Sequence, residues 1–98
     1  MKQQTPTIRV KIIGLPTTKV RHAVTNATAS LSHFEVKPKI QWISDIQKIA
    51  SMGALVVPTI LVNEKLKSSG RIPSVHEFKT WIEEEQGNLL LIEQEYSH

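Results

Sequence analysis

The chain has 98 residues, of which 40% are hydrophobic and 21% charged, so it has room for one small soluble domain. It contains no cysteine, which excludes a disulfide framework, a thiolate metal site and dithiol redox chemistry within these residues. The basic residues are concentrated in residues 1–76, with 11 Lys or Arg against 3 Asp or Glu, whereas residues 77–98 have 1 against 6. The Lys and Arg are dispersed and not interleaved with aromatic residues, so we do not expect a nucleic-acid partner.

The ends of the sequence and its other candidate sites exclude further classes. No apolar run approaches the length of a membrane span, and no apolar signal core follows the first residues, so we expect a cytoplasmic protein with no membrane partner. The four histidines never fall at metal-ligand spacing, and no cofactor motif is present, so we expect neither a metal nor a cofactor.

The first half of the chain predicts a strand, a helix, a second strand and a short helix. Period-two alternation over residues 8–12 indicates a strand that ends at Gly14. The hydroxyl of Thr17 or Thr18 caps the following helix. A second extended stretch begins at Pro38. A capping box then starts a short helix, with Ser44 as the cap and Gln47 three residues later. Apolar residues of the two helices form one face of each: Val20, Ala23, Val24, Ala27 and Leu31 in the first, Ile46, Ile49 and Ala50 in the second.

The second half begins with the most apolar run of the chain, residues 54–62, which is typical of a strand buried on both faces. Proline cannot donate to a strand ladder, so the strand is expected to begin just after Pro58, with a special bond, either cis or trans, at Val57-Pro58. A tight turn over residues 63–65 leads to a short strand over residues 66–69.

A second capping box, from Ser74 to Glu77, predicts a last helix that ends near Gly87. Residues 83–85 are three consecutive glutamates, which we interpret as a solvated acidic face, and Trp42 and Trp81 are interpreted as packing residues. The element order is βαβ-αββα. It predicts a single α/β domain with a mixed four-stranded sheet and helices on both faces. We expect a flexible segment over residues 1–7, the domain over residues 8–86 and a C-terminal tail over residues 87–98.

This element order, with an apolar residue before the proline of the third strand, resembles thioredoxin. More narrowly, it resembles the small glutaredoxin-like proteins called redox-active disulfide proteins. Residues 43–53, 57–63 and 68–74 carry the resemblance, and the Ser-Ser-Gly-Arg-Ile-Pro-Ser segment is the most specific of them. The resemblance covers roughly residues 8–84. It implies a thioredoxin-like domain with a cis-proline at Pro58.

The redox motif departs from that family. Aligning Gly14 with the family's loop glycine places Thr17 and Val20 where the two cysteines stand, with Thr18 and Lys19 between them. Threonine cannot form the mixed disulfide of thiol exchange, and valine cannot resolve one. We therefore expect a redox-inactive domain that is not a thiol oxidoreductase.

Three functions remain open for such a domain. The first is binding of a protein or extended peptide at the former redox corner, with Leu15, Thr17, Thr18, Lys19, Val20, Val57 and Pro58 as the binding residues. In the family, the residue before the cis-proline offers its backbone to such a ligand, and Arg71 would border the groove. The second is binding of a small anion or thiol compound at the N-terminus of the first helix. The third is self-association to a homo-oligomer through residues 88–98.

Overall fold

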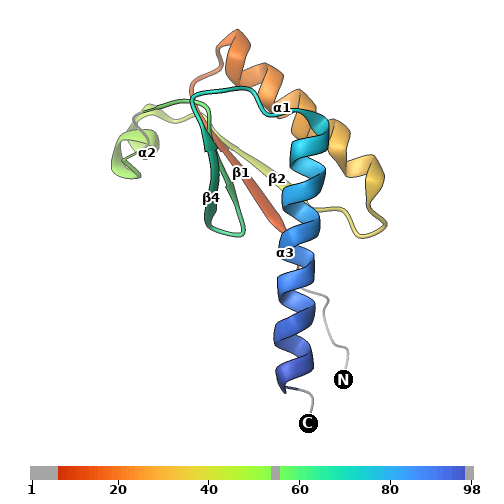
Figure 1. Cartoon of the computed structure of the whole chain (residues 1–98). Coiled ribbons are helices and arrows are strands. Elements are labelled where there is room, and N and C mark those ends of the chain that lie inside the picture. The colour runs from red at the N-terminus through yellow and green to blue at the C-terminus, as the bar shows by residue number, and fades with distance from the viewer. Residues whose placement is uncertain (1–6, 54–55, 97–98) are drawn as a thin grey trace.

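The computed structural model describes residues 7–53 and 56–96, and side chains as far as residue 89. Its centre is a four-stranded sheet in the order β2-β1-β3-β4 (Figure 1). The strands are β1 (Arg9–Ile13), β2 (Lys39–Ile43), β3 (Thr59–Val62) and β4 (Lys65–Ser69). β1 and β2 are parallel, and both β1–β3 and β3–β4 are antiparallel. The expected mixed sheet is therefore confirmed.

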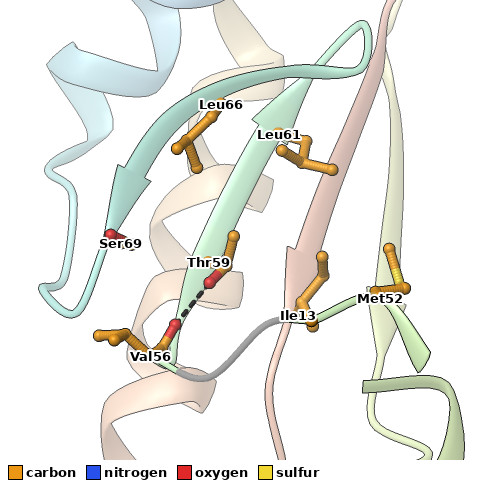
Figure 2. A pocket seen from close by; sticks show the side chains of 8 residues that line it. Ile13, Met52, Val56, Thr59, Leu61, Leu66 and Ser69 are labelled. Carbon is orange, nitrogen blue, oxygen red and sulfur yellow. Dashed lines mark hydrogen bonds between the residues drawn. The ribbon is translucent and has the colours of Figure 1, made fainter. Parts of the chain in front are cut away.

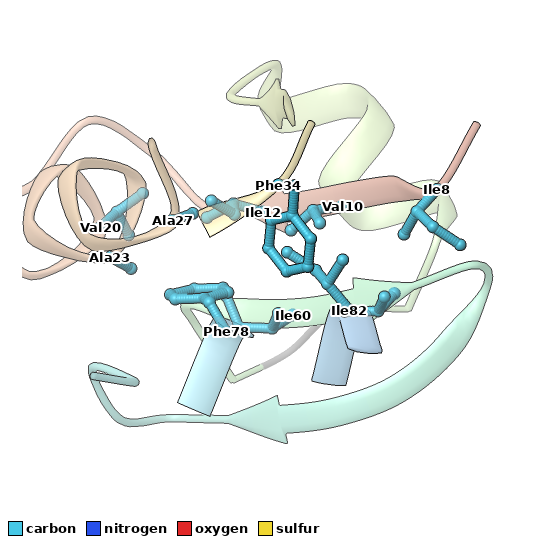
Figure 3. Close-up of a cluster of buried hydrophobic side chains, with 11 residues drawn as sticks. Ile8, Val10, Ile12, Val20, Ala23, Ala27, Phe34, Ile60, Phe78 and Ile82 are labelled. Atoms are coloured by element: carbon cyan, nitrogen blue, oxygen red, sulfur yellow. The ribbon is translucent and has the colours of Figure 1, made fainter. Parts of the chain in front are cut away.

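The main core lies between one face of the sheet and two helices, α1 (Thr18–Ser30) and α3 (Val75–Tyr96). We call this side the closed face. Val10 and Ile12 of β1 pack there with Phe78 and Ile82 of α3, and all four side chains are fully buried (Figure 3). The predicted stripe of α1 supplies Val20, Ala23 and Ala27. Phe34, just after a 3-10 turn at Leu31–His33, covers the end of this core.

The opposite side of the sheet, here called the open face, is covered only in part. Ile49 of the short helix α2 (Ile46–Ser51) packs with Ile13 and Ile43, and Leu61 lies half-buried beside them. Helices therefore lie on both faces as predicted, but six residues of α2 cannot cover a whole sheet. For the same reason, the expectation of a third strand buried on both faces was wrong, because Thr59 and Leu61 stay partly exposed.

Two details of α2 differ from the sequence prediction. The N-cap is Asp45 rather than Ser44, because the Asp45 carboxylate accepts a hydrogen bond of 2.8 Å from the Gln47 backbone N–H. The helix consequently begins one residue later than the capping box implied. Ile46 is 65% exposed and Ala50 is also exposed, so Ile49 is the buried contact of this helix.

The start of α3 agrees with the prediction in full. The Glu77 N–H donates to Ser74 Oγ over 3.1 Å, and the Ser74 N–H donates to Glu77 Oε1 over 3.0 Å, which is the reciprocal pattern of a capping box. The expected end near Gly87 was wrong, because α3 continues to Tyr96. A glycine ends a helix when it takes a left-handed conformation, but the positive φ values fall at Gly53 and Gly70, not at Gly87. The Leu, Glu and Gln residues that follow are good helix formers.

The predicted boundary between residues 86 and 87 therefore falls inside a helix. The segment expected to be flexible, residues 1–7, lies outside the described residues apart from Thr7. Glu85 also differs from expectation. The glutamates at positions 83 and 84 are exposed, but Glu85 is buried and forms ion pairs of 3.1 Å with Lys65 and Lys67 of β4. Consecutive helical residues point about 100° apart, so the three glutamates cannot share one solvated face.

Candidate functional site

The predicted site lies where the loop after β1 meets the segment that leads into β3. Gly14 is in close contact with both partners of this corner: a Cβ atom on it would lie 2.6 Å from Val20 Cγ2 and 3.3 Å from Val57 Cβ. The Gly14 carbonyl accepts a 2.9 Å hydrogen bond from the Trp42 indole, and the Gly14 N–H donates to the Ile43 carbonyl over 3.0 Å. Gly14 thus holds the end of β1 against β2 and leaves room for α1 to approach residue 57.

Thr17 is the N-cap of α1, as its hydroxyl accepts a 3.3 Å hydrogen bond from the Val20 N–H. The Thr17 N–H donates a hydrogen bond of 2.7 Å to the Leu15 carbonyl in the preceding loop. The first turn of α1 contains no acidic residue. The side chains of Thr17, Thr18 and Lys19 are all exposed.

Two of the predicted binding residues are not at the surface. Val20 is fully buried, because position 20 lies on the core side of α1 with Ala23 and Ala27. Pro58 is also buried, and it lies directly before β3, whose Ile60 and Val62 pack in the closed-face core. The expectation that the Val20 side chain contacts a ligand was therefore wrong. Both side chains pack beneath the surface of the corner and are not exposed to a ligand.

The exposed apolar atoms of the corner come from three other residues. Leu15 is 41% exposed, Val57 is 36% exposed and Val56, which the sequence analysis did not single out, is 55% exposed. The peptide bond between Val57 and Pro58 is cis. Among the described residues, no hydrogen bond engages the N–H or the carbonyl of Val57. A backbone donor and acceptor thus lie beside exposed apolar side chains.

Gly70 forms the opposite wall of the corner. Its N–H donates to the Pro58 carbonyl over 3.0 Å, and its carbonyl accepts a hydrogen bond from the Lys19 ammonium. Its φ of +82° favours glycine, and a Cβ atom there would lie 2.8 Å from Val56 Cγ1. The loop before α3 is consequently joined to both residue 19 and residues 56–58.

Arg71, expected to border the groove, is directed to α3 instead. Its guanidinium forms a two-pronged pair with Glu77, with N–O distances of 2.9 and 2.6 Å. Together with the Ser74 N–H, this pair lowers the pKa of Glu77 to about 2, and the pKa of Arg71 is raised by the same hydrogen bond. Arg71 therefore fixes the start of α3.

A separate hollow of about 300 Å³ lies on the open face, and Figure 2 shows the side chains around it. Leu61 and Leu66 project into it from neighbouring strands, and Met52 borders it from the end of α2. Val56 lies at its edge and so separates it from the corner at Val57. The sequence analysis missed this hollow, although Leu66 between two lysines was a signal of an apolar side chain on a polar strand.

Two further findings concern other classes of site. Within residues 7–53 and 56–96, no three His, Asp or Glu side chains gather in a way that could hold a metal ion. No helix in that described part is both long enough and apolar enough to span a membrane.

Residues 8–83 match the family model described as "Thioredoxin domain". The chain belongs to that family. No curated protein matches it. The matched range begins just before β1 and ends within α3. The corner of Gly14, Thr17 and Val57 therefore lies inside it. Because these 98 residues contain no cysteine, this domain has no thiol of its own with which to exchange disulfides.

Proposed function

We propose that this thioredoxin domain is a redox-inactive, non-enzymatic module that binds an extended segment of another protein. The ligand lies over Leu15, Thr17, Thr18 and Lys19 on one side and Val57 on the other. The observation that carries the proposal is the Val57 backbone, whose N–H and carbonyl have no partner among the described residues and lie beside exposed apolar side chains.

The physical basis is strand addition. An extended peptide gains affinity from main-chain hydrogen bonds to an unpaired backbone edge and gains specificity from neighbouring side-chain contacts. Val57 would supply the main-chain pair, and Leu15 and Val56 would supply the apolar contacts. The exposed threonine hydroxyls at the start of α1 add polar contacts at the rim. None of these interactions requires a cysteine.

A small anion or thiol compound at the start of α1 is the competing function. The absence of an acidic residue from the first turn suits an anion. Against it, the Lys19 ammonium already donates to the Gly70 carbonyl, so an anion would have to compete with that contact. The peptide proposal needs no such rearrangement, and it is the one we favour.

The test uses three baits: wild type, Val57→Asp and Val36→Asp. Val36 is 55% exposed and lies in the loop before β2, so the third bait is a control for adding a negative charge to an exposed valine. A protein captured from native extract is purified, and its affinity is measured for each bait. We expect Val36→Asp to bind like wild type and Val57→Asp to lose about tenfold or more in affinity.

Val57 also contacts the Gly14 region, so Leu15→Asp serves as a second corner variant, and matched thermal unfolding confirms that each bait is folded. Backbone amide shifts on adding the partner are expected at residues 15, 56 and 57. Equal affinity of all folded baits would contradict the proposal. Shifts confined to residues 17–20, produced by phosphate or glutathione alone, would favour the anion function instead.

A further inference from the structure

The edge of the sheet at β2 is a main-chain surface that the proposed function does not use. β2 is the outermost strand on one side, and within the described part of the chain it pairs with β1 alone. The Lys39 N–H donates to the Ile8 carbonyl over 2.9 Å, and the Gly14 N–H donates to the Ile43 carbonyl over 3.0 Å. In a parallel pair, alternate residues of a strand bond to the same neighbour. The odd-numbered residues of β2 thus direct their N–H and carbonyl groups to β1, and the even-numbered residues direct theirs outwards.

The even-numbered residues of β2 are Ile40 and Trp42. Within residues 7–53 and 56–96, no hydrogen bond engages the main-chain N–H or carbonyl of either one. Both side chains lie on the closed face at the margin of the main core, where they stay half-buried. This edge therefore offers main-chain hydrogen bonds to an added strand, beside an apolar row that the fold covers only in part.

We propose that β2 pairs in antiparallel fashion with β2 of a second copy of this chain. The two sheets then join into one continuous sheet, with both closed faces on the same side and the two-fold axis beside Gln41. Ile40 of each copy exchanges main-chain hydrogen bonds with Trp42 of the other, and Gln41 faces its own counterpart as a non-hydrogen-bonded pair. The Ile40 and Trp42 side chains meet across the new pair, which is a favourable combination of a β-branched and an aromatic residue.

The sequence of β2 suits a partner identical to itself. An isologous contact uses one patch twice, so the strand must match itself when it is reversed. Apolar residues flank Gln41 on both sides at equal spacing, and reversal leaves that arrangement unchanged. Centring the pair on Ile40 instead would place Trp42 opposite Pro38, which has no N–H to donate. Centring it on Trp42 would place Ile40 opposite residue 44, beyond the end of β2.

The charges of β2 agree with the register centred on Gln41. Lys39 of one copy falls opposite Ile43 of the other, so the two lysines are separated by about 13 Å along the strands. Asp45 is exposed and follows Ile43 by two residues, so it lies at the end of β2 that the start of the other strand reaches. Reversal therefore brings Lys39 of one copy towards Asp45 of the other and keeps like charges apart.

The absence of cysteine allows a direct test, because one introduced thiol can bond only to its counterpart in another copy. In a non-hydrogen-bonded antiparallel pair the Cα atoms lie about 4.5 Å apart, which is within the range of a disulfide. Gln41→Cys is therefore expected to form a covalent dimer under mild oxidation. Lys39→Cys is the matched control, since residue 39 is also exposed on β2 but lies too far from its counterpart to bond, and it is expected to stay largely monomeric.

Sedimentation velocity of the full chain over a range of concentrations measures the association itself. Wild type is expected to form a dimer as the concentration rises. Hydrogen exchange over the same range identifies the strand, because the amides of Ile40 and Trp42 are expected to gain protection when they donate to the second copy.

Two substitutions on β2 are expected to weaken the dimer. Ile40→Pro removes an outward N–H, which an edge strand tolerates, and it should abolish dimer formation. Gln41→Lys sets two lysines opposite each other and should raise the dissociation constant about two- to fivefold. Ser69→Lys is the control, because it adds the same charge at an exposed residue of the other edge strand, β4, and it should leave the dissociation constant unchanged.

Thermal unfolding shows which variants are folded. Wild type that stays monomeric at every concentration would overturn the proposal, and so would equal crosslinking of Gln41→Cys and Lys39→Cys. A dimer that survives in folded Ile40→Pro would overturn it as well. If Ile40→Pro does not fold, equal dissociation constants for Gln41→Lys and Ser69→Lys would have the same meaning. Val57→Asp is expected to dimerise normally, so failure of this proposal is distinguishable from failure of the proposed peptide site.

Discussion

The two faces of the sheet differ in how completely they are covered. On the closed face, Val10, Ile12, Ile60 and Val62 are fully buried beneath two long helices. On the open face, the residues that alternate with them include Arg9, Lys11 and Leu61, and within residues 7–53 and 56–96 α2 is the only helix that lies above them. The comparison indicates that the closed face supplies most of the fold's stability. The open face and the adjoining corner at Val57 leave apolar and charged groups available for other molecules.

The largest effect is expected from Phe78→Ala, which removes a fully buried ring from the closed face. The free energy of unfolding should fall by about 3–5 kcal/mol, because the lost transfer energy adds to that of the cavity left behind. Leu66→Ala on the open face should change it by less than about 0.5 kcal/mol, since Leu66 is 64% exposed. Urea unfolding of both variants measures the difference. Similar losses for the two would show that the open face is also a core.

A smaller effect is expected at the corner, where Gly14→Ala introduces a Cβ atom 2.6 Å from Val20 Cγ2. Overpacking of this kind should lower the free energy of unfolding by about 1–3 kcal/mol. If the contact with Val20 is the cause, Gly14→Ala should cost less in a Val20→Ala background than in wild type. A double-mutant cycle measures this coupling. Strictly additive losses would mean that Gly14 and Val20 do not support the corner together.

Asp45, the N-cap of α2, provides a test of stability on the open face. Asp45→Ala should lower the free energy of unfolding by about 1 kcal/mol, because the Gln47 N–H loses its side-chain acceptor. Ser44→Ala, one residue earlier, should have almost no effect. Chemical unfolding of the two variants measures these losses. A larger loss for Ser44→Ala than for Asp45→Ala would show that Ser44 is the cap.

The smallest effect is expected from the exposed ion pair at the start of α3. The pKa of Glu77 is lowered to about 2 by Arg71 and the Ser74 N–H, so its ionised form stabilises the folded state. This contribution is present above the carboxyl's ordinary pKa, about 4.3, and it is lost as the pH falls towards 2. Glu77→Gln should therefore flatten the dependence of stability on pH in that interval. If the free energy of unfolding depended on pH in the same way for wild type and Glu77→Gln, the lowered pKa of Glu77 would be contradicted.

Glu85 contributes to the same acid sensitivity from the edge of the closed face. Burial disfavours its ionised form, but hydrogen bonds from Lys65, Lys67 and Asn88 outweigh that cost, so its pKa is lowered. Its stabilising contribution is likewise lost on acidification. Some acid sensitivity should therefore remain in Glu77→Gln.

The sequence predicted those elements whose signals are local. The reciprocal Ser74–Glu77 box, a threonine cap at position 17 or 18 and the beginning of β3 after Pro58 all depend on residues within a few positions of each other, and the structure contains each of them, with Thr17 as the cap. The turn at Asn63 is also present, with φ values of 50° and 66° at Asn63 and Glu64 that suit a two-residue hairpin.

Features that depend on tertiary packing could not be predicted in the same way. Val20 was placed by the sequence both on the apolar face of the first helix and among the binding residues, and the second interpretation fails because the apolar face packs on the sheet. Burial of Glu85 requires two lysines from a strand 18 and 20 residues earlier in sequence. Continuation of α3 past Gly87 depends on the helix formers that follow, which outweigh a single unfavourable residue.

The most direct test of the central claim, that the corner at Val57 binds an extended protein segment, is the affinity of the purified partner for three folded proteins. These are wild type, Val57→Asp and the matched control Val36→Asp. The account predicts equal affinity for wild type and the control, and about tenfold or greater weakening for Val57→Asp. Equal binding by all three would place the partner elsewhere on the domain and contradict the account.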